Sequence, residues 1–208
     1  MAVLAYHEPI TQVKTYSGNS PMALSFPEYQ SESATVIQPG VPLQLNSGYA
    51  AVWNGSTYTK GIVGIASGFG QNLATSGAGA PVPPFGQVTG GGAIQYWGSV
   101  PNQPSAHNIA PGTPMATGRQ EAVFLAVADT IFEAQIDNSN TGSAVTSRAL
   151  VSTDYQLTVD ANGLWYVDLY KTANPVLVIV QLNPLDPIGT ANGRVWFTFL
   201  PSAYQLGS

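Results

Sequence analysis

The sequence predicts a mainly β protein, with a small β-barrel, a second β-sandwich-like or barrel-like region and an extended N-terminal arm. Two observations predict this class. From residue 34 onward, short runs of β-branched and aromatic residues recur and are separated by Gly, Pro and Asn. The chain also lacks a convincing amphipathic helix, and its best partial candidate is 146–151. With 208 residues and no cysteine, the chain can bury a core without disulfides or metals.

Residues 1–33 are predicted to form the arm. They include three prolines and show no sustained helical or strand periodicity. They nevertheless carry more large apolar side chains than disordered segments usually do, which favours an arm that docks on a neighbour over a disordered tail. The candidate contacts with a neighbouring subunit or partner are the large side chains of this segment: Tyr6, Tyr16, Met22, Leu24, Phe26 and Tyr29.

Residues 34–118 are predicted to hold the β-barrel domain. The expected strands are the β-type runs at 34–37, 41–45, 49–53, 61–66 and 93–97. Between the last two lies a stretch, 67–92, that is rich in Gly, Ala, Ser, Thr and Pro. We interpret it as a long exposed loop within one barrel, although a linker between domains is an alternative.

Residues 119–208 are predicted to form the second β-region, either separate from the first or continuous with it. The expected strands are 122–127, 131–136, 155–159, 164–170, 176–182 and 194–200. The spacing of the first two predicts a tight β-hairpin. Alternation along the second puts Ile131, Glu133 and Gln135 on one face and Phe132, Ala134 and Ile136 on the other.

The composition indicates a surface that is covered in an assembly. Only 8% of the residues are charged, whereas soluble monomers usually rely on mixed surface charge. A compact, uncharged β-protein is the alternative interpretation. The net charge of −5 and the six scattered Lys and Arg residues argue against a nucleic-acid partner. The longest apolar runs, such as 175–180, are too short to cross a bilayer, and no secretory signal precedes them, so we expect a cytoplasmic product.

The search for catalytic or metal-binding chemistry finds no supported site. His7 and His107 have no second ligand at metal-site spacing and are interpreted as surface residues. Residues 137–142 open like a calcium loop, but Arg148 stands at the twelfth position, so a polar turn is expected. No nucleophile elbow, phosphate-binding loop or dinucleotide fingerprint is present. The sequence therefore predicts no enzyme, no cofactor and no metal.

Several stretches, taken in order, resemble the capsid decoration, or cement, proteins of tailed phages. The most specific of them is 128–137, Ala-Asp-Thr-Ile-Phe-Glu-Ala-Gln-Ile-Asp. The others are the barrel-entry runs 39–45, 48–52 and 61–66 and the later run 193–199. The resemblance covers about four-fifths of the chain and includes no catalytic signature.

This resemblance implies a small barrel, SH3-like or similar, coupled to a second β-region. It also implies a homo-oligomer, with a trimer favoured, that binds the major capsid protein on the outside of the virion and reinforces subunit contacts. A tail, baseplate or head-fibre component is one alternative. A second alternative is a carbohydrate-binding module that would use exposed aromatic side chains as stacking platforms. Core and cross-strand packing is the favoured interpretation of the tryptophans of the chain: Trp53, Trp97, Trp165 and Trp196.

Overall fold

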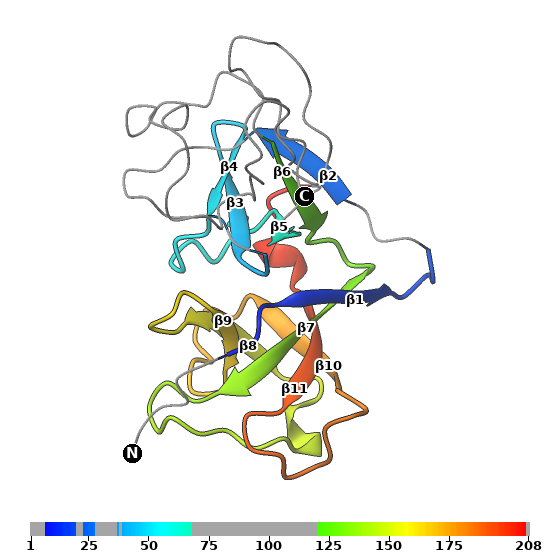
Figure 1. Cartoon of the computed structure of the whole chain (residues 1–208), viewed down its shortest axis with the longest axis vertical. Helices are drawn as coiled ribbons and strands as arrows, with labels where there is room; N and C mark the ends of the chain where they lie inside the picture. Colours follow the sequence, from blue (N-terminus) through cyan, green and yellow to red (C-terminus); the bar gives the residue numbers. More distant parts are fainter. Residues whose placement is uncertain (1–6, 20–22, 28–36, 38, 68–119, 207–208) are drawn as a thin grey trace, which may run out of the picture.

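The computed structural model describes residues 7–19, 23–27, 37, 39–67 and 120–206. These residues form a mainly β structure with two sheets, as the sequence predicts. The sheets are stacked along the long axis of the molecule, and strand β1 (Thr11–Thr15) crosses between them (Figure 1). None of the helical turns in this part of the chain is long and apolar enough to span a membrane.

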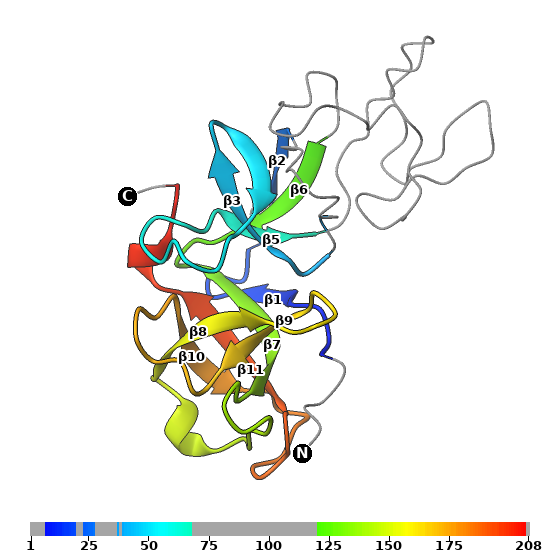
Figure 2. The same ribbon diagram turned by 90° about the vertical axis from the view of Figure 1, so that its left-hand side faces the viewer.

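Five strands of the lower sheet close into a barrel. They are β7 (Thr130–Asp137), β8 (Asp154–Val159), β9 (Trp165–Asp168), β10 (Leu177–Leu182) and β11 (Arg194–Phe199). The order β7-β11-β10-β8-β9 returns to β7, because the end of β7 pairs in parallel with β9. The first half of β7 pairs with β1, and the end of β7 pairs with β9 (Figure 2). The edge of β7 that does not pair with β11 is therefore shared by two strands.

Alternation along the strands fills the barrel. Phe132 of β7 meets Phe197 and Phe199 of β11 at ring-centroid distances of 5.8 and 5.4 Å, and all three rings are buried. On β7 the buried Phe132, Ala134 and Ile136 alternate with the outward-facing Glu133 and Gln135. The predicted alternation is confirmed at these five positions.

The second sheet has the order β2-β6-β5-β3-β4. Its strands are β2 (Ala23–Pro27), β3 (Pro42–Asn46), β4 (Tyr49–Val52), β5 (Gly64–Ala66) and β6 (Gln120–Leu125). Glycine is required at Gly64, where a Cβ would lie only 2.1 Å from the carbonyl oxygen of Phe124 on β6. The close approach of β5 and β6 therefore depends on the absence of a side chain.

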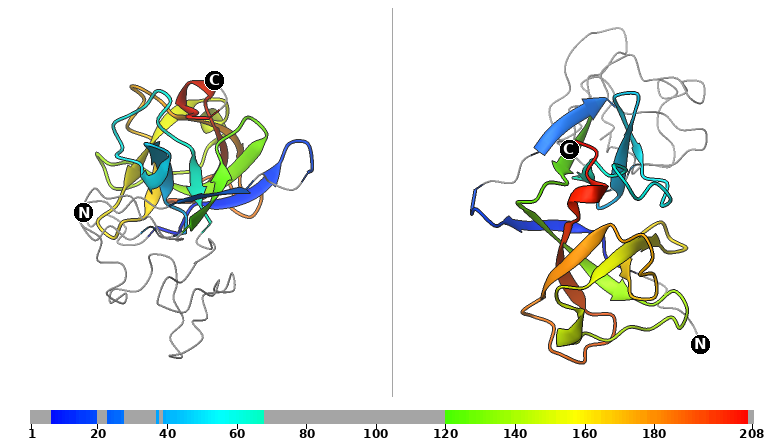
Figure 3. Two further views of the ribbon diagram at one scale, coloured as in Figure 1. Left: turned by 90° about the horizontal axis from the view of Figure 1, so that it is seen from above. Right: turned by 180° about the vertical axis from the view of Figure 1, so that it is seen from behind.

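The C-terminal segment joins the two sheets. After β11, a single 3₁₀ turn, η3 (Pro201–Ala203), leads to Tyr204, which bridges Ile62 (Figure 3). The Gln205 side chain accepts a hydrogen bond from the Leu45 N–H and donates one to the Leu45 carbonyl oxygen. Trp53 and Trp165, one from each half, pack with their ring centroids 5.4 Å apart. Buried residues of both sheets thus form one continuous core.

The predicted strands of the second half agree closely with the structure, but the predicted hairpin is wrong. β6 pairs with β2 and β5, whereas β7 pairs with β1, β9 and β11, so the two strands belong to different sheets. The Ala126 N–H donates to the Val63 carbonyl, which extends the contact with the segment before β5. The short connection between β6 and β7 crosses from one sheet to the other, although it is no longer than a hairpin loop.

Two parts of the predicted arm, β1 and β2, are strands of these sheets. Within 1–33 the structure describes 7–19 and 23–27, and the other residues lie outside the described part. The predicted strand 93–97 and all of the predicted loop 67–92 except Ser67 also lie outside it. The proposed domain limits stay a prediction. The partial helix candidate 146–151 contains one 3₁₀ turn, η2 (Arg148–Leu150).

Candidate functional site

A group of polar side chains lies on the outer faces of β7 and β11. Glu133 and Gln135 of β7 face outward, and so do Arg194 and Trp196 of β11. The strand register places Arg194 opposite Gln135 and Trp196 opposite Glu133. These four side chains therefore form one cross-strand group on the outside of the barrel.

Charged groups on this face are mostly paired. Arg194 donates from Nε and Nη2 to the two carboxylate oxygens of Asp186, at 3.0 and 2.9 Å, in a bidentate arrangement. Its hydrogen bonds with Asp186 hold the pKa of Arg194 above, and that of Asp186 below, the ordinary value. Glu133 Oε2 accepts hydrogen bonds from Asn183 and from the Trp196 indole, and its Oε1 lies 3.7 Å from Arg194 Nη1.

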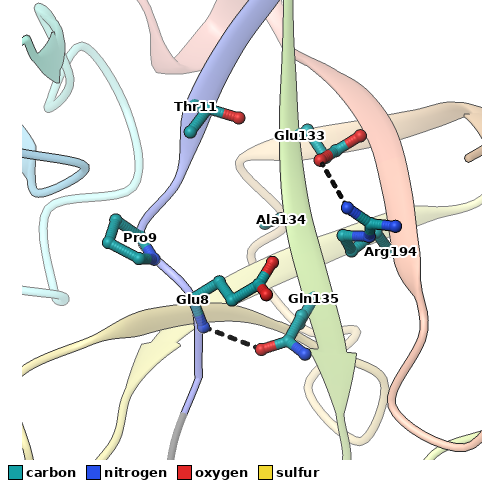
Figure 4. Close-up of a pocket in the computed structure, with 7 residues that line it drawn as sticks. All are labelled: Glu8, Pro9, Thr11, Glu133, Ala134, Gln135 and Arg194. Atoms are coloured by element: carbon teal, nitrogen blue, oxygen red, sulfur yellow. Dashed lines mark hydrogen bonds and ion pairs between the residues drawn. The ribbon is translucent and has the colours of Figure 1, made fainter.

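A pocket of about 210 Å³ opens beside this group (Figure 4). Its lining comes from the segment around the start of β1 and from the outer face of β7 and β11: Glu8, Pro9, Thr11, Glu133, Ala134, Gln135 and Arg194. The Glu8 N–H donates to Gln135 Oε1 at 2.8 Å, which fixes the segment before β1 against β7. Glu133 and Arg194 thus form a charged wall of the pocket, and the segment that carries Glu8 is held at its edge.

A second polar cluster is buried at the end of β7, and it shows that the expectation of a surface position for His7 is wrong. His7 is only 1% exposed. Its Nδ1 lies 2.9 Å from Asp160 Oδ2 and its Nε2 lies 3.3 Å from Asp137 Oδ2. The ring stacks on Tyr166 at 4.4 Å. These partners are more than a hundred residues away in the chain, so no local pattern around His7 could indicate them.

Asp168 is the centre of the hydrogen bonds in this region. Its carboxylate is fully buried and accepts hydrogen bonds from the backbone N–H groups of Ser139 and Tyr170 and from the Thr158 hydroxyl. Lys171 Nζ lies 3.8 Å away. Burial first, and then the negative charges of the neighbouring aspartates, raise the pKa of the Tyr166 phenol. The hydrogen bonds of Asp168 thus tie β8 and β9 to the segments that follow β7 and β9.

The stability of the fold should fall in acid because of two carboxylates. Burial raises the pKa of Asp160, but hydrogen bonds from His7, Leu164 and Asn162 outweigh burial and leave that pKa low; the pKa of Asp186 is lowered by Arg194. A lowered folded-state pKa stabilises the protein above the unfolded value near 3.9, and this stabilisation is lost as pH falls through the folded value. Urea unfolding between about pH 6 and pH 2 should therefore show a steep loss of stability below about pH 4.

The matched variants for this titration are Asp186→Asn and Asp154→Asn. Asp154 is exposed and forms no ion pair with the residues that the structure describes. D186N should flatten the acid dependence, while D154N should leave it unchanged. Equal slopes for the wild type and D186N would show that the Asp186–Arg194 pair does not contribute to acid sensitivity.

Three of the six predicted contact residues are described. Tyr16 is 57% exposed in the turn after β1, where its N–H donates to the Asp129 carbonyl. Leu24 is 44% exposed on β2, and Phe26 is half-buried against the core. Tyr6, Met22 and Tyr29 lie outside the described residues. The structure does not bring Tyr16 and Leu24 onto one strand, and their role in contacts stays a prediction.

Of the three tryptophans within the described residues, two are placed as the core-packing interpretation expects. Trp53 and Trp165 are buried. Trp196 is half-buried, and Lys14 Nζ lies 4.4 Å from its ring centroid. Trp97 and His107 are outside the described residues.

The turn 137–142 uses its oxygen atoms internally. Asn138 Oδ1 accepts the N–H groups of Asn140 and Thr141, as in an Asx turn, in agreement with the expected polar turn. No group of three or more His, Cys, Asp or Glu residues within the described ranges is arranged to hold a metal ion.

Comparisons of the chain with protein-family models, curated proteins and solved structures find no match.

Proposed function

We propose that the chain is a structural protein of a tailed-phage virion that binds the outer capsid surface and stabilises contacts between major capsid subunits. The observation that carries the proposal is a set of exposed apolar side chains on two loops, one after β7 and one between β10 and β11. Val145, Leu185 and Ile188 are 52%, 80% and 57% exposed. Exposed apolar groups that are held rigidly favour attachment to another protein surface.

Hydrogen bonds hold the two loops that carry these side chains. The Thr146 hydroxyl donates to the Pro187 carbonyl at 2.8 Å and accepts from the Thr190 N–H at 3.0 Å. The Gly189 N–H donates to the Thr146 carbonyl. Because the loops are already ordered, less conformational entropy is lost when they bind.

The low charge of the whole chain supports the same proposal. With only 8% charged residues, the surface is suited to being covered. Repetition on a symmetric lattice would raise the avidity of a modest interface, so each copy needs no exceptional affinity, whether it binds as a monomer or as the expected homotrimer.

Co-sedimentation tests this function. Capsids from a phage genome that lacks this gene are mixed with the purified chain and pelleted. The wild-type chain should pellet with the capsids in a saturable amount, and a Leu185→Ser, Ile188→Ser double variant should pellet less. A Val159→Ser variant is the control, because Val159 is 45% exposed at the end of β8, away from these loops. Absence of wild-type chain from the pellet would contradict the proposal.

A further inference from the structure

Glu8 differs from the other charged groups around the pocket. Asp186 and Arg194 are paired, and Glu133 accepts two hydrogen bonds. The Glu8 carboxylate makes no hydrogen bond or ion pair within the described part of the chain, although its charge helps to raise the pKa of Arg194. Its backbone is nevertheless fixed through the hydrogen bond to Gln135. An anchored residue therefore presents a carboxylate that has no directly bonded counter-ion among the residues that the structure describes.

The Glu8 carboxylate lies at the wall of the pocket. Figure 4 shows the Glu8 side chain reaching from the segment before β1 towards Gln135, with Glu133 and Arg194 farther along the same wall. Part of the remaining lining is carbon surface, to which the exposed Pro9 contributes. Among the described residues, Glu133 Oε1 has the contact with Arg194 at 3.7 Å, so this oxygen can still accept a hydrogen bond.

The charge balance favours a cation in the pocket. Glu8, Glu133 and Asp186 contribute three negative charges, and Arg194 and Lys14 contribute two positive ones. Asp186 neutralises Arg194 through two hydrogen bonds, and Lys14 is placed over the Trp196 ring. The uncompensated charge is thus negative and is located at Glu8, so an incoming cation is attracted.

We propose that this pocket binds the cationic side chain of a lysine or arginine from a protein partner. The aliphatic stem of such a side chain packs on the carbon surface, while its charged head lies between the carboxylates of Glu8 and Glu133. The volume of about 210 Å³ suits one side chain better than a drug-sized ligand. This inference goes beyond the proposed function, since it holds for any protein partner and can be tested on the chain alone.

The test is an NMR titration of the full chain with three small probes: N-acetyl-lysine methylamide, N-acetyl-arginine methylamide and the uncharged N-acetyl-norleucine methylamide. The two cationic probes should shift the backbone signals of Ala134 and Gln135 and the side-chain amide signal of Gln135, with millimolar affinity. The norleucine probe should not. Raising the salt concentration from about 0.02 to about 0.3 M should weaken the binding of the cationic probes, since the pocket is open to solvent.

Two single-charge variants give the matched comparison. Glu8→Gln removes the unpaired carboxylate and should weaken the binding of the cationic probes by about threefold to fivefold. Asp154→Asn removes one exposed charge elsewhere on the barrel and should change the affinity by less than about twofold. The inference is overturned if the norleucine probe shifts the same signals equally, if E8Q binds as the wild type does, or if the cationic probes shift signals only elsewhere. Capsid co-sedimentation by a chain that fails this titration would overturn this inference alone.

Discussion

Replacing Asp168 with alanine is expected to lower the free energy of unfolding by about 3–5 kcal/mol, because it removes the acceptor at the centre of a buried cluster. The carboxylate is fully buried and accepts from Ser139, Tyr170 and Thr158. Without it, three part-buried donors lose their acceptor and the space of a fully buried side chain is left empty. Urea unfolding at neutral pH measures the effect.

Asp168→Asn and Asp154→Ala are the controls for this prediction. Asparagine keeps one acceptor oxygen, so D168N should lose less stability than D168A and should remain measurable if the alanine variant does not fold. Asp154 is exposed, and D154A should change stability by no more than about 0.5 kcal/mol. Equal stabilities for D168A and D154A would contradict the role assigned to the cluster.

Truncation of Phe197 to alanine is expected to cost about 3–5 kcal/mol, since it opens a cavity in the barrel interior. Phe197 is fully buried between Phe132 and Phe199, at centroid distances of 5.8 and 5.4 Å. Its loss should also weaken the near-ultraviolet circular dichroism of the aromatic side chains. Thermal and urea unfolding give the stability change.

The matched substitution is Val159→Ala, on a strand of the same barrel but 45% exposed. It should shift stability by less than about 0.5 kcal/mol. If F197A unfolds at the same urea concentration as V159A, the phenylalanine cluster is not the core of the barrel.

Strand positions in the second half could be predicted from the sequence because each strand carries its own alternation. Val195, Phe197 and Phe199 are buried while Arg194, Trp196 and Thr198 face outward, and this period of two is visible in the letters alone. Turn signals such as Asn162-Gly163 mark the ends of the strands in the same local way.

Pairing could not be predicted, because it depends on contacts between distant segments. The run 122–127 followed by 131–136 fits a hairpin by spacing, yet the two strands join different sheets. Strands β1 and β2 have weak local patterns, and their register is set by β7 and β6. Long-range pairing of this kind overrides the local interpretation.

The pocket and the His7 cluster were missed for the same reason. Glu8 meets Gln135 across 127 positions, and His7 meets Asp160 across 153. The outward face of β7 was nevertheless visible in the alternation that exposes Glu133 and Gln135. The sequence therefore indicates the wall of the pocket that β7 forms, but not the wall that Glu8 forms.

Electron microscopy of virions tests whether the chain is bound to the outer capsid surface. Particles are reconstructed from phage stocks made with and without this chain, and the two capsid maps are compared. We expect additional density on the outer capsid surface, at boundaries between major capsid subunits, only when the chain is present. The barrel of β7 to β11 should fit that density. Identical capsid maps, or density confined to the tail, baseplate or a head fibre, would contradict this expectation.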